Sequence, residues 1–76
     1  MIFITGILML DKNNRVFMMR PDRREQIPVT SGQYLYLSVS KVWIPVMIRY
    51  SEQMQKWFFE GMPELNIFHR KVMIKD

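Results

Sequence analysis

Residues 2–20 read IFITGILMLDKNNRVFMMR, two apolar runs separated by a short polar segment. The first run, residues 2–10, is rich in Ile, Leu and Phe, which is typical of a β-strand. Residues 11–14 supply the Asp and Asn side chains that tolerate the left-handed backbone of hairpin turns. Residues 15–20 then form a second strand, which ends at Pro21 because proline cannot donate to a central ladder. This stretch predicts a β-hairpin and therefore indicates a β fold.

Two features inside the hairpin carry further expectations. Gly6 interrupts the first strand, which indicates a bulge or a close approach of neighbouring backbone. Met18 and Met19 are adjacent in the second strand. Because successive side chains in a strand point to opposite faces, one of these two methionines faces away from the core. We expect that outward methionine to belong to a partner or dimer surface.

The segment after the hairpin, residues 21–33, contains two prolines, a glycine and a dense run of charges. It predicts a long loop with at most a short edge strand around residues 27–30. Residues 34–40 alternate strictly, with Tyr34, Tyr36 and Ser38 on one face and Leu35, Leu37 and Val39 on the other. The second set is expected in the core, and the tyrosines at the rim or surface.

The remainder of the chain predicts further short elements. Residues 42–50 form a strand interrupted by Pro45, which indicates an edge position or a bulge there. Another strand follows at residues 57–60, and residues 70–75 close the chain as a last one. Between them, residues 64–69 are expected to form at most one helical or 3₁₀ turn, with Leu65 and Phe68 on the same side.

The fold predicted for residues 1–76 is therefore a single small, mostly β domain with five or six short antiparallel strands. An SH3-like barrel is the first expectation, because closure removes strand edges that would otherwise pair with neighbours. An OB-like barrel is the second. A strongly curled antiparallel sheet that completes itself by dimerising is the third.

Composition limits how such a chain is stabilised and where it works. Its 76 residues include no Cys and one His, so neither a disulfide nor a structural zinc site is expected. Stability must come from apolar packing, supplemented by self-association. The longest apolar run, residues 2–10, has about half the length of a membrane-spanning helix and lacks the flanks of a secretory signal. The sequence predicts a soluble, cytoplasmic protein with no membrane partner.

Five short motifs together resemble a family of small uncharacterised bacterial proteins with a Gly-x-Leu opening, a Trp-x-Pro strand and a Trp-Tyr-Leu strand. The matching segments are Gly6-Ile7-Leu8, Arg15-Val16-Phe17, Trp43-Ile44-Pro45, Ile48-Arg49-Tyr50 and Trp57-Phe58-Phe59. The chain departs from that pattern where Met47 replaces an expected Arg and Arg49 an expected acid. The resemblance implies a small β domain of bacteria or their mobile elements, and it implies no activity.

Catalytic chemistry finds little support in the residues. Cys is absent, His69 is the sole imidazole, and no Gly-x-Ser-x-Gly elbow exists. Gly6, Gly32 and Gly61 are isolated, so no phosphate-binding glycine motif is present. The acidic residues fall mostly in predicted turns, without the spacing of a calcium loop. We predict that the chain is not an enzyme and uses no cofactor or metal.

Binding chemistry is better represented, and the chain has a net charge of +4. The candidate contacts with a nucleic acid or a partner are Arg15, Arg20, Arg23, Arg24, Tyr34, Tyr36 and Trp43. Paired tyrosines on one strand face are able to stack on bases, and arginines on phosphates. The simpler interpretation is a solvated loop, in which Asp22 and Glu25 offset the arginines, and ordinary tyrosine packing. Trp43 either lines a peptide groove or caps the core, whereas Trp57 is expected in the core.

The sequence thus leads to two functional hypotheses. The first is a non-enzymatic protein-interaction or adaptor module, working through a strand edge or an aromatic and methionine patch, with a protein partner or a second copy of the chain. The alternative is a small nucleic-acid-binding β-barrel, motivated by the basic charge balance.

Overall fold

The computed structural model describes residues 2–75 and is built of strands and turns, with no helix in that range. Seven strands follow one another along the chain: β1 (Phe3–Leu10), β2 (Val16–Arg20), β3 (Glu25–Val29), β4 (Gln33–Val39), β5 (Val42–Ser51), β6 (Lys56–Phe59) and β7 (Lys71–Lys75). The all-β class predicted from the sequence is confirmed.

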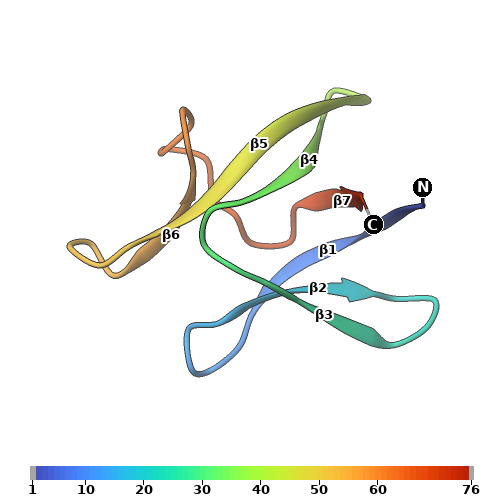
Figure 1. Ribbon diagram of the computed structural model, residues 1–76, viewed down its shortest axis with the longest axis horizontal. Coiled ribbons are helices and arrows are strands. Elements are labelled where there is room, and N and C mark those ends of the chain that lie inside the picture. The colour runs from blue at the N-terminus through green and yellow to red at the C-terminus, as the bar shows by residue number, and fades with distance from the viewer. Residues whose placement is uncertain (1, 76) are drawn as a thin grey trace.

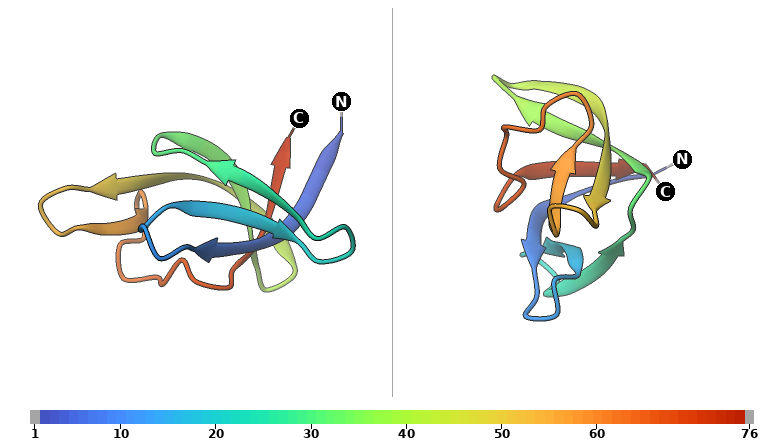
Figure 2. Two further views of the ribbon diagram at one scale, coloured as in Figure 1. Left: turned by 90° about the horizontal axis from the view of Figure 1, so that it is seen from below. Right: turned by 90° about the vertical axis from the view of Figure 1, so that its left-hand side faces the viewer.

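All seven strands belong to one antiparallel sheet with the order β3-β2-β1-β7-β4-β5-β6 (Figure 1). The last strand of the chain, β7, lies between the first strand and β4, and so joins the two halves of the sheet. The sheet curls strongly, as the end-on view shows (Figure 2), but its end strands β3 and β6 are not paired with each other. The described chain is therefore one open, curled sheet.

The strand count exceeds the predicted five or six, because residues 25–29 form a full strand and not a loop with a short edge. β3 pairs with β2 over five residues, from Arg20↔Glu25 to Val16↔Val29. Pro28 is tolerated there because β3 lies at the edge of the sheet, where a missing donor costs no ladder bond. The composition of this segment favoured a loop, but its position at the edge of the sheet allows it to form a strand despite Pro28.

The N-terminal hairpin is confirmed, with β1 and β2 paired from Ile7↔Met19 to Leu10↔Val16. Its turn is held by Asp11, whose Oδ1 accepts hydrogen bonds from the backbone N–H groups of Asn13 and Arg15 at 2.8 and 2.9 Å. Asn14 adopts the left-handed conformation, with φ of 61°. The Asp and Asn residues thus perform the turn chemistry expected of them.

Gly6 marks a close approach of backbone, one of the two alternatives that the sequence left open. A Cβ at this position would lie 2.4 Å from the carbonyl oxygen of Met19 and 2.7 Å from Cγ of Met18. Gly6 also pairs with Val72 of β7. The glycine therefore allows β1 to pass close to β2 at the position where it also pairs with β7.

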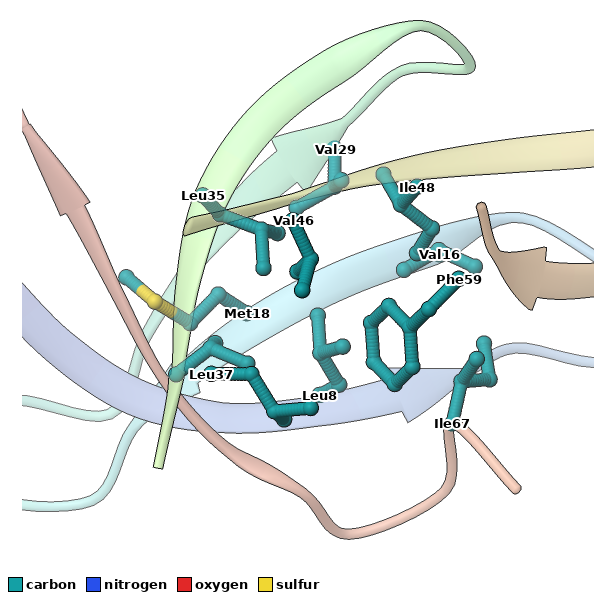
Figure 3. Packing of buried hydrophobic residues seen from close by; sticks show 11 residues of the cluster. Leu8, Val16, Met18, Val29, Leu35, Leu37, Val46, Ile48, Phe59 and Ile67 are labelled. Atoms are coloured by element: carbon teal, nitrogen blue, oxygen red, sulfur yellow. The ribbon is translucent and has the colours of Figure 1, made fainter. Parts of the chain in front are cut away.

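The core forms on the concave side of the curled sheet, where alternate side chains of every strand meet (Figure 3). Leu35 and Leu37 point inward as predicted, whereas Val39 is 36% exposed because it ends its strand at the tip of the hairpin. The buried apolar residues are Leu8, Val16, Met18, Val29, Leu35, Leu37, Val46, Ile48, Phe59, Ile67 and Val72. No polar side chain of residues 2–75 is buried among them.

In the C-terminal part, the edge position expected at Pro45 is confirmed, although the strand is not interrupted there, and the helical turn expected over residues 64–69 needs correction. β5 is continuous through Pro45, which pairs with Tyr36 on one side, while β6 pairs only with residues 48–51, so Pro45 lies on a free edge. No helical turn forms over residues 64–69. Ile67 is the buried residue of that segment, and Phe68 is 46% exposed, so Leu65 and Phe68 do not form a shared apolar side.

Candidate recognition surface

The outer face of the sheet consists of the strand side chains that point away from the core. Because successive side chains of a strand point to opposite faces, the buried residues of each strand identify the residues that belong to the outer face. On β1, β4, β5 and β7 the outer face carries Phe3, Tyr34, Tyr36, Trp43, Lys71 and Lys75, which we call the aromatic–lysine face. Strand pairing, and not sequence proximity, brings these six side chains together.

The strand registers place this face in rows across the sheet. Thr5 lies beside Met73, Met73 beside Tyr36, and Tyr36 beside Pro45. A second row holds Ile7 beside Lys71 and Ser38 beside Trp43. These rows lie two residues apart along each strand, or about 7 Å.

Specific contacts fix the side chains of this face. The rings of Phe3 and Tyr36 meet edge to face, with centroids 6.1 Å apart. The Nζ atom of Lys71 lies 6.0 Å from the ring centroid of Trp43, at the outer limit of a cation–π contact. Tyr34 is 70% exposed and Phe3 49% exposed, so both ring systems are accessible to a ligand.

The electrostatics of the aromatic–lysine face are one-sided. The four strands that build it contain no Asp or Glu, while they contain Arg49, Lys71 and Lys75. Within residues 2–75, neither Lys71 nor Lys75 takes part in an ion pair. Arg49 at the border is bound to Glu60 (Nε–Oε2 2.8 Å), and this hydrogen bond raises the pKa of Arg49 above its ordinary value.

The four predicted arginines do not belong to this face. Arg15 and Arg20 flank β2, so their Cα atoms are roughly 16 Å apart at about 3.3 Å per residue. Arg15 lies 3.6 Å from Asp11, and Arg20 donates to Glu25 at 3.0 Å. Arg23 and Arg24 lie in the turn between β2 and β3. Glu25, one of the two acids expected to offset Arg23 and Arg24, instead pairs with Arg20.

Asp11 is the one carboxyl whose titration the turn alters clearly. Backbone N–H donation from Arg15, together with that from Asn13, holds the pKa of Asp11 below its usual range. The carboxylate is thus engaged by the hairpin turn. The Asp11 carboxylate therefore offsets only part of the positive charge that Lys12 and Arg15 bring to this corner of the molecule.

Tyr34, Tyr36 and Trp43 are the three predicted residues that the fold brings together. Sequence analysis missed their basic neighbours, Lys71 and Lys75. The alternation of residues 71–75 was a usable signal, because it places both lysines on the same side as Met73. What the sequence did not provide was the position of β7 between β1 and β4.

A second set of outer side chains lies on the first hairpin. Ile7, Met9, Phe17 and Met19 form a block, in which Ile7 is paired with Met19 and Met9 with Phe17. All four are partly exposed, whereas Met18 is fully buried. The prediction that one of the adjacent methionines faces outward is confirmed, and that residue is Met19. We call this set the methionine block.

The two tryptophans differ in their surroundings. Trp57 packs against the core, lies 5.3 Å from the ring of Tyr50, and donates its indole N–H to the carbonyl oxygen of Asn14 at 2.9 Å. Trp43 is half-buried on the outer face beside Lys71. Trp57 is therefore a structural residue, as predicted, and Trp43 is a surface residue.

A pocket of about 420 Å³ lies elsewhere, between the turns at one end of the sheet. Its lining contains one Lys and one Glu, and none of the seven predicted contact residues. The lining residues are Leu10, Asn14, Gln55, Lys56, Trp57, Glu64, Asn66, Ile67 and Phe68.

Across residues 2–75, no group of three His, Asp or Glu side chains is arranged to hold a metal ion. No helix in that range has the length and apolar character to cross a membrane.

Comparison with known proteins extends the fold and leaves the function open. The crystal structure of a Ruminococcus gnavus protein, solved by the Northeast Structural Genomics Consortium, is similar to this chain with a TM-score of 0.77 and 22% identity. The match covers 93% of this chain and 100% of the other. No family model and no curated protein matches. The curled sheet is therefore a fold shared with a bacterial protein, and the family resemblance drawn from the sequence stays a prediction.

Proposed function

We propose that this chain is a small, non-enzymatic, cytoplasmic nucleic-acid-binding module that works through its aromatic–lysine face. The observation that carries the proposal is the combination of accessible aromatic rings with Lys71 and Lys75 on four strands that contain no carboxylate. Lysines that form no ion pair within residues 2–75 are available to phosphates, and nearby aromatic faces bind bases.

The free edges of the sheet are poorly suited to pairing with an added strand, which favours the outer face as the binding surface. Proline lacks the N–H donor that an added strand needs, and Pro28 and Pro45 occupy the free edges of β3 and of the first half of β5. The edge of β6 is short, and the Met62 N–H donates to the carbonyl oxygen of Phe59 there. Strand addition is thus disfavoured at all three places.

The finer fold assignment belongs to the same proposal. Residues 31 and 32, which lead from β3 into β4, continue along β5, and the Gly32 N–H donates to the carbonyl oxygen of Ile48 at 2.7 Å. Ser31 Oγ likewise accepts from the N–H of Tyr50. We take this arrangement as an incomplete SH3-like barrel, a scaffold on which the outer face of the sheet is available to a ligand.

Fluorescence anisotropy with labelled nucleic acid tests the proposal. The wild-type chain is expected to bind with micromolar affinity that falls steeply between about 50 and 200 mM salt. The double variant K71E/K75E is expected to lose tenfold or more, with a salt slope smaller by about two, one for each lost phosphate contact.

The matched control is R23E/R24E, which changes net charge by the same amount in the β2–β3 turn. It is expected to lose only the small, general part of the attraction. An equal or larger loss in R23E/R24E would move the site to the turn, and no binding by the wild-type chain at low salt would refute the nucleic-acid function.

A protein-interaction or adaptor role is the second candidate, and the methionine block favours it. Four partly exposed apolar side chains in one block are an adaptable contact surface. The occupant to test first is a second copy of the chain, by sedimentation over a wide concentration range. The double variant F17S/M19S should then weaken the dimer, and a monomer at all concentrations would contradict self-association through this block.

A further inference from the structure

We infer that the aromatic–lysine face selects single-stranded over double-stranded nucleic acid, with bases stacked on Tyr36, Trp43 and Phe3 and phosphates held by Lys71 and Lys75. This inference rests on the proposed function and names the form of its ligand. The inference follows from the placement of the aromatic rings, because net charge alone would attract single and double strands alike.

Ring accessibility gives the first argument. In a duplex the faces of the bases are hidden by their neighbours, so an aromatic side chain finds a base to stack on only in a single strand or at an end. A surface built for a duplex needs basic side chains and few rings. The face described here carries Phe3, which is 49% exposed, and the half-buried rings of Tyr36 and Trp43, together with Lys71 and Lys75.

Spacing gives the second argument. The row with Tyr36 and the row with Trp43 are two residues apart, or about 7 Å along the strands. Stacked bases of a duplex are separated by about 3.4 Å, so two neighbouring bases cannot remain stacked on each other while each covers one of these rings. A single strand with splayed bases has no such conflict.

Charge placement gives the third argument. Lys71 lies beside Trp43, and Lys75 is paired with Phe3 across β1 and β7. Each lysine is thus adjacent to a ring, so a nucleotide stacked on the ring has its phosphate within reach of an ammonium group. Tyr34, 70% exposed on the same face of β4, extends the platform toward Arg49.

The test compares a short labelled oligothymidylate with a duplex of the same length, under the same salt. The wild-type chain is expected to bind the single strand at least tenfold more tightly. Y36L and W43L are each expected to weaken single-strand binding about tenfold, because base–aromatic stacking contributes on that scale. Single-strand binding should also quench tryptophan fluorescence in the wild-type chain, and the quenching should be lost in W43L.

F68L is the matched aromatic control, because Phe68 is 46% exposed but lies in the loop before β7 and outside the face. It should bind like the wild type, and thermal melting should show that all variants fold. Equal or tighter binding of the duplex, with Y36L and W43L unchanged, would overturn the single-strand inference and leave the proposed function standing. Absence of binding to either form would refute the proposed function itself.

Discussion

The two halves of the sheet present opposite outer surfaces, although both share one core. In the half made of β1, β2 and β3, the paired outer side chains of β1 and β2 are apolar, while Arg15 meets Asp11 at the β1–β2 turn and Arg20 meets Glu25 at the adjoining ends of β2 and β3. In the half made of β7, β4 and β5, lysines stand on the strands among aromatic rings. The difference teaches that the number of basic residues matters less here than whether acids stand beside them.

Gly6 is the position where the largest effect on both halves is expected. β1 belongs to each half, through β2 and through β7. In Gly6→Ala the new Cβ would collide with the Met19 carbonyl, so backbone must shift. We expect a loss of about 3 kcal/mol in the free energy of unfolding, measured by urea denaturation. Thr5→Ala, at the exposed neighbouring position, is the control and should change stability little; a harmless Gly6→Ala would show that the strands separate easily.

The hairpin turns of the two halves differ as well. The β1–β2 turn is held by the Asp11 hydrogen bonds, whereas the β4–β5 turn places Ser40 and Lys41 at φ of 49° and 67°. Two positive φ values define a type I′ turn, which favours Asn-Gly. S40N/K41G should therefore raise stability by about 1 kcal/mol, or roughly 4–8 °C in Tm. An unchanged or lower Tm in a calorimetric scan would show that the turn is not strained.

An exposed ion pair joins Arg49 of β5 to Glu60, which directly follows β6. Arg49→Met is expected to lower the free energy of unfolding only slightly, because exposed ion pairs contribute little. The nucleic-acid affinity of Arg49→Met should also be measured. A loss of affinity much smaller than that of K71E/K75E is expected, because Glu60 already neutralises Arg49. A loss as large as that of the lysine variant would extend the site to β5 and β6.

A smaller effect is expected from pH in the first half. The folded-state pKa of Asp11 lies below its ordinary value of 3.8, so its contribution is present above about pH 4 and is lost as pH falls through the folded pKa. In Asp11→Asn the side-chain oxygen still accepts hydrogen bonds but does not titrate. The stability difference between wild type and this variant should therefore shrink on acidification, in denaturation curves recorded from neutral pH down to acid. A difference that stays constant would show that the carboxylate is not stabilised by the turn.

The smallest effect is expected from F17S/M19S on nucleic-acid binding. Both residues belong to the methionine block of the first half, and Met19 is separated from Lys71 by Ile7 of β1, which pairs with both. The anisotropy titration should give an affinity within about twofold of the wild type, because no phosphate or base contact is removed. A tenfold loss would mean that the two halves act as one surface.

Local sequence was enough for the elements whose partners are close in the chain. The first hairpin, the alternation of residues 34–40 and the outward methionine at position 19 follow from turn residues and a period of two. Residues 25–29 were missed as a strand because Pro28 counts against one unless the strand is known to lie at an edge. The 64–69 segment showed helical spacing, but the core takes up Ile67 and leaves Phe68 outside.

The candidate surface depended on pairing across long sequence separations. Alternation placed Tyr34 and Tyr36 on one face, whereas Trp43 was left between a peptide groove and the core. Lys71 and Lys75 join them only because β7 is inserted between β1 and β4, a register that no local pattern encodes. The arginines stood out in the sequence because they are clustered, yet clustering along a turn does not place them on a face.

The central claim is that the lysines of β7, and not the arginines of the β2–β3 turn, hold a nucleic acid. The most direct measurement is the salt dependence of binding to one labelled single strand for the wild type, K71E/K75E and R23E/R24E. The account predicts a tenfold or larger loss and a reduced slope for the lysine variant, with R23E/R24E close to the wild type. Equal behaviour of the two variants, or a wild-type chain that does not bind at low salt, would contradict it.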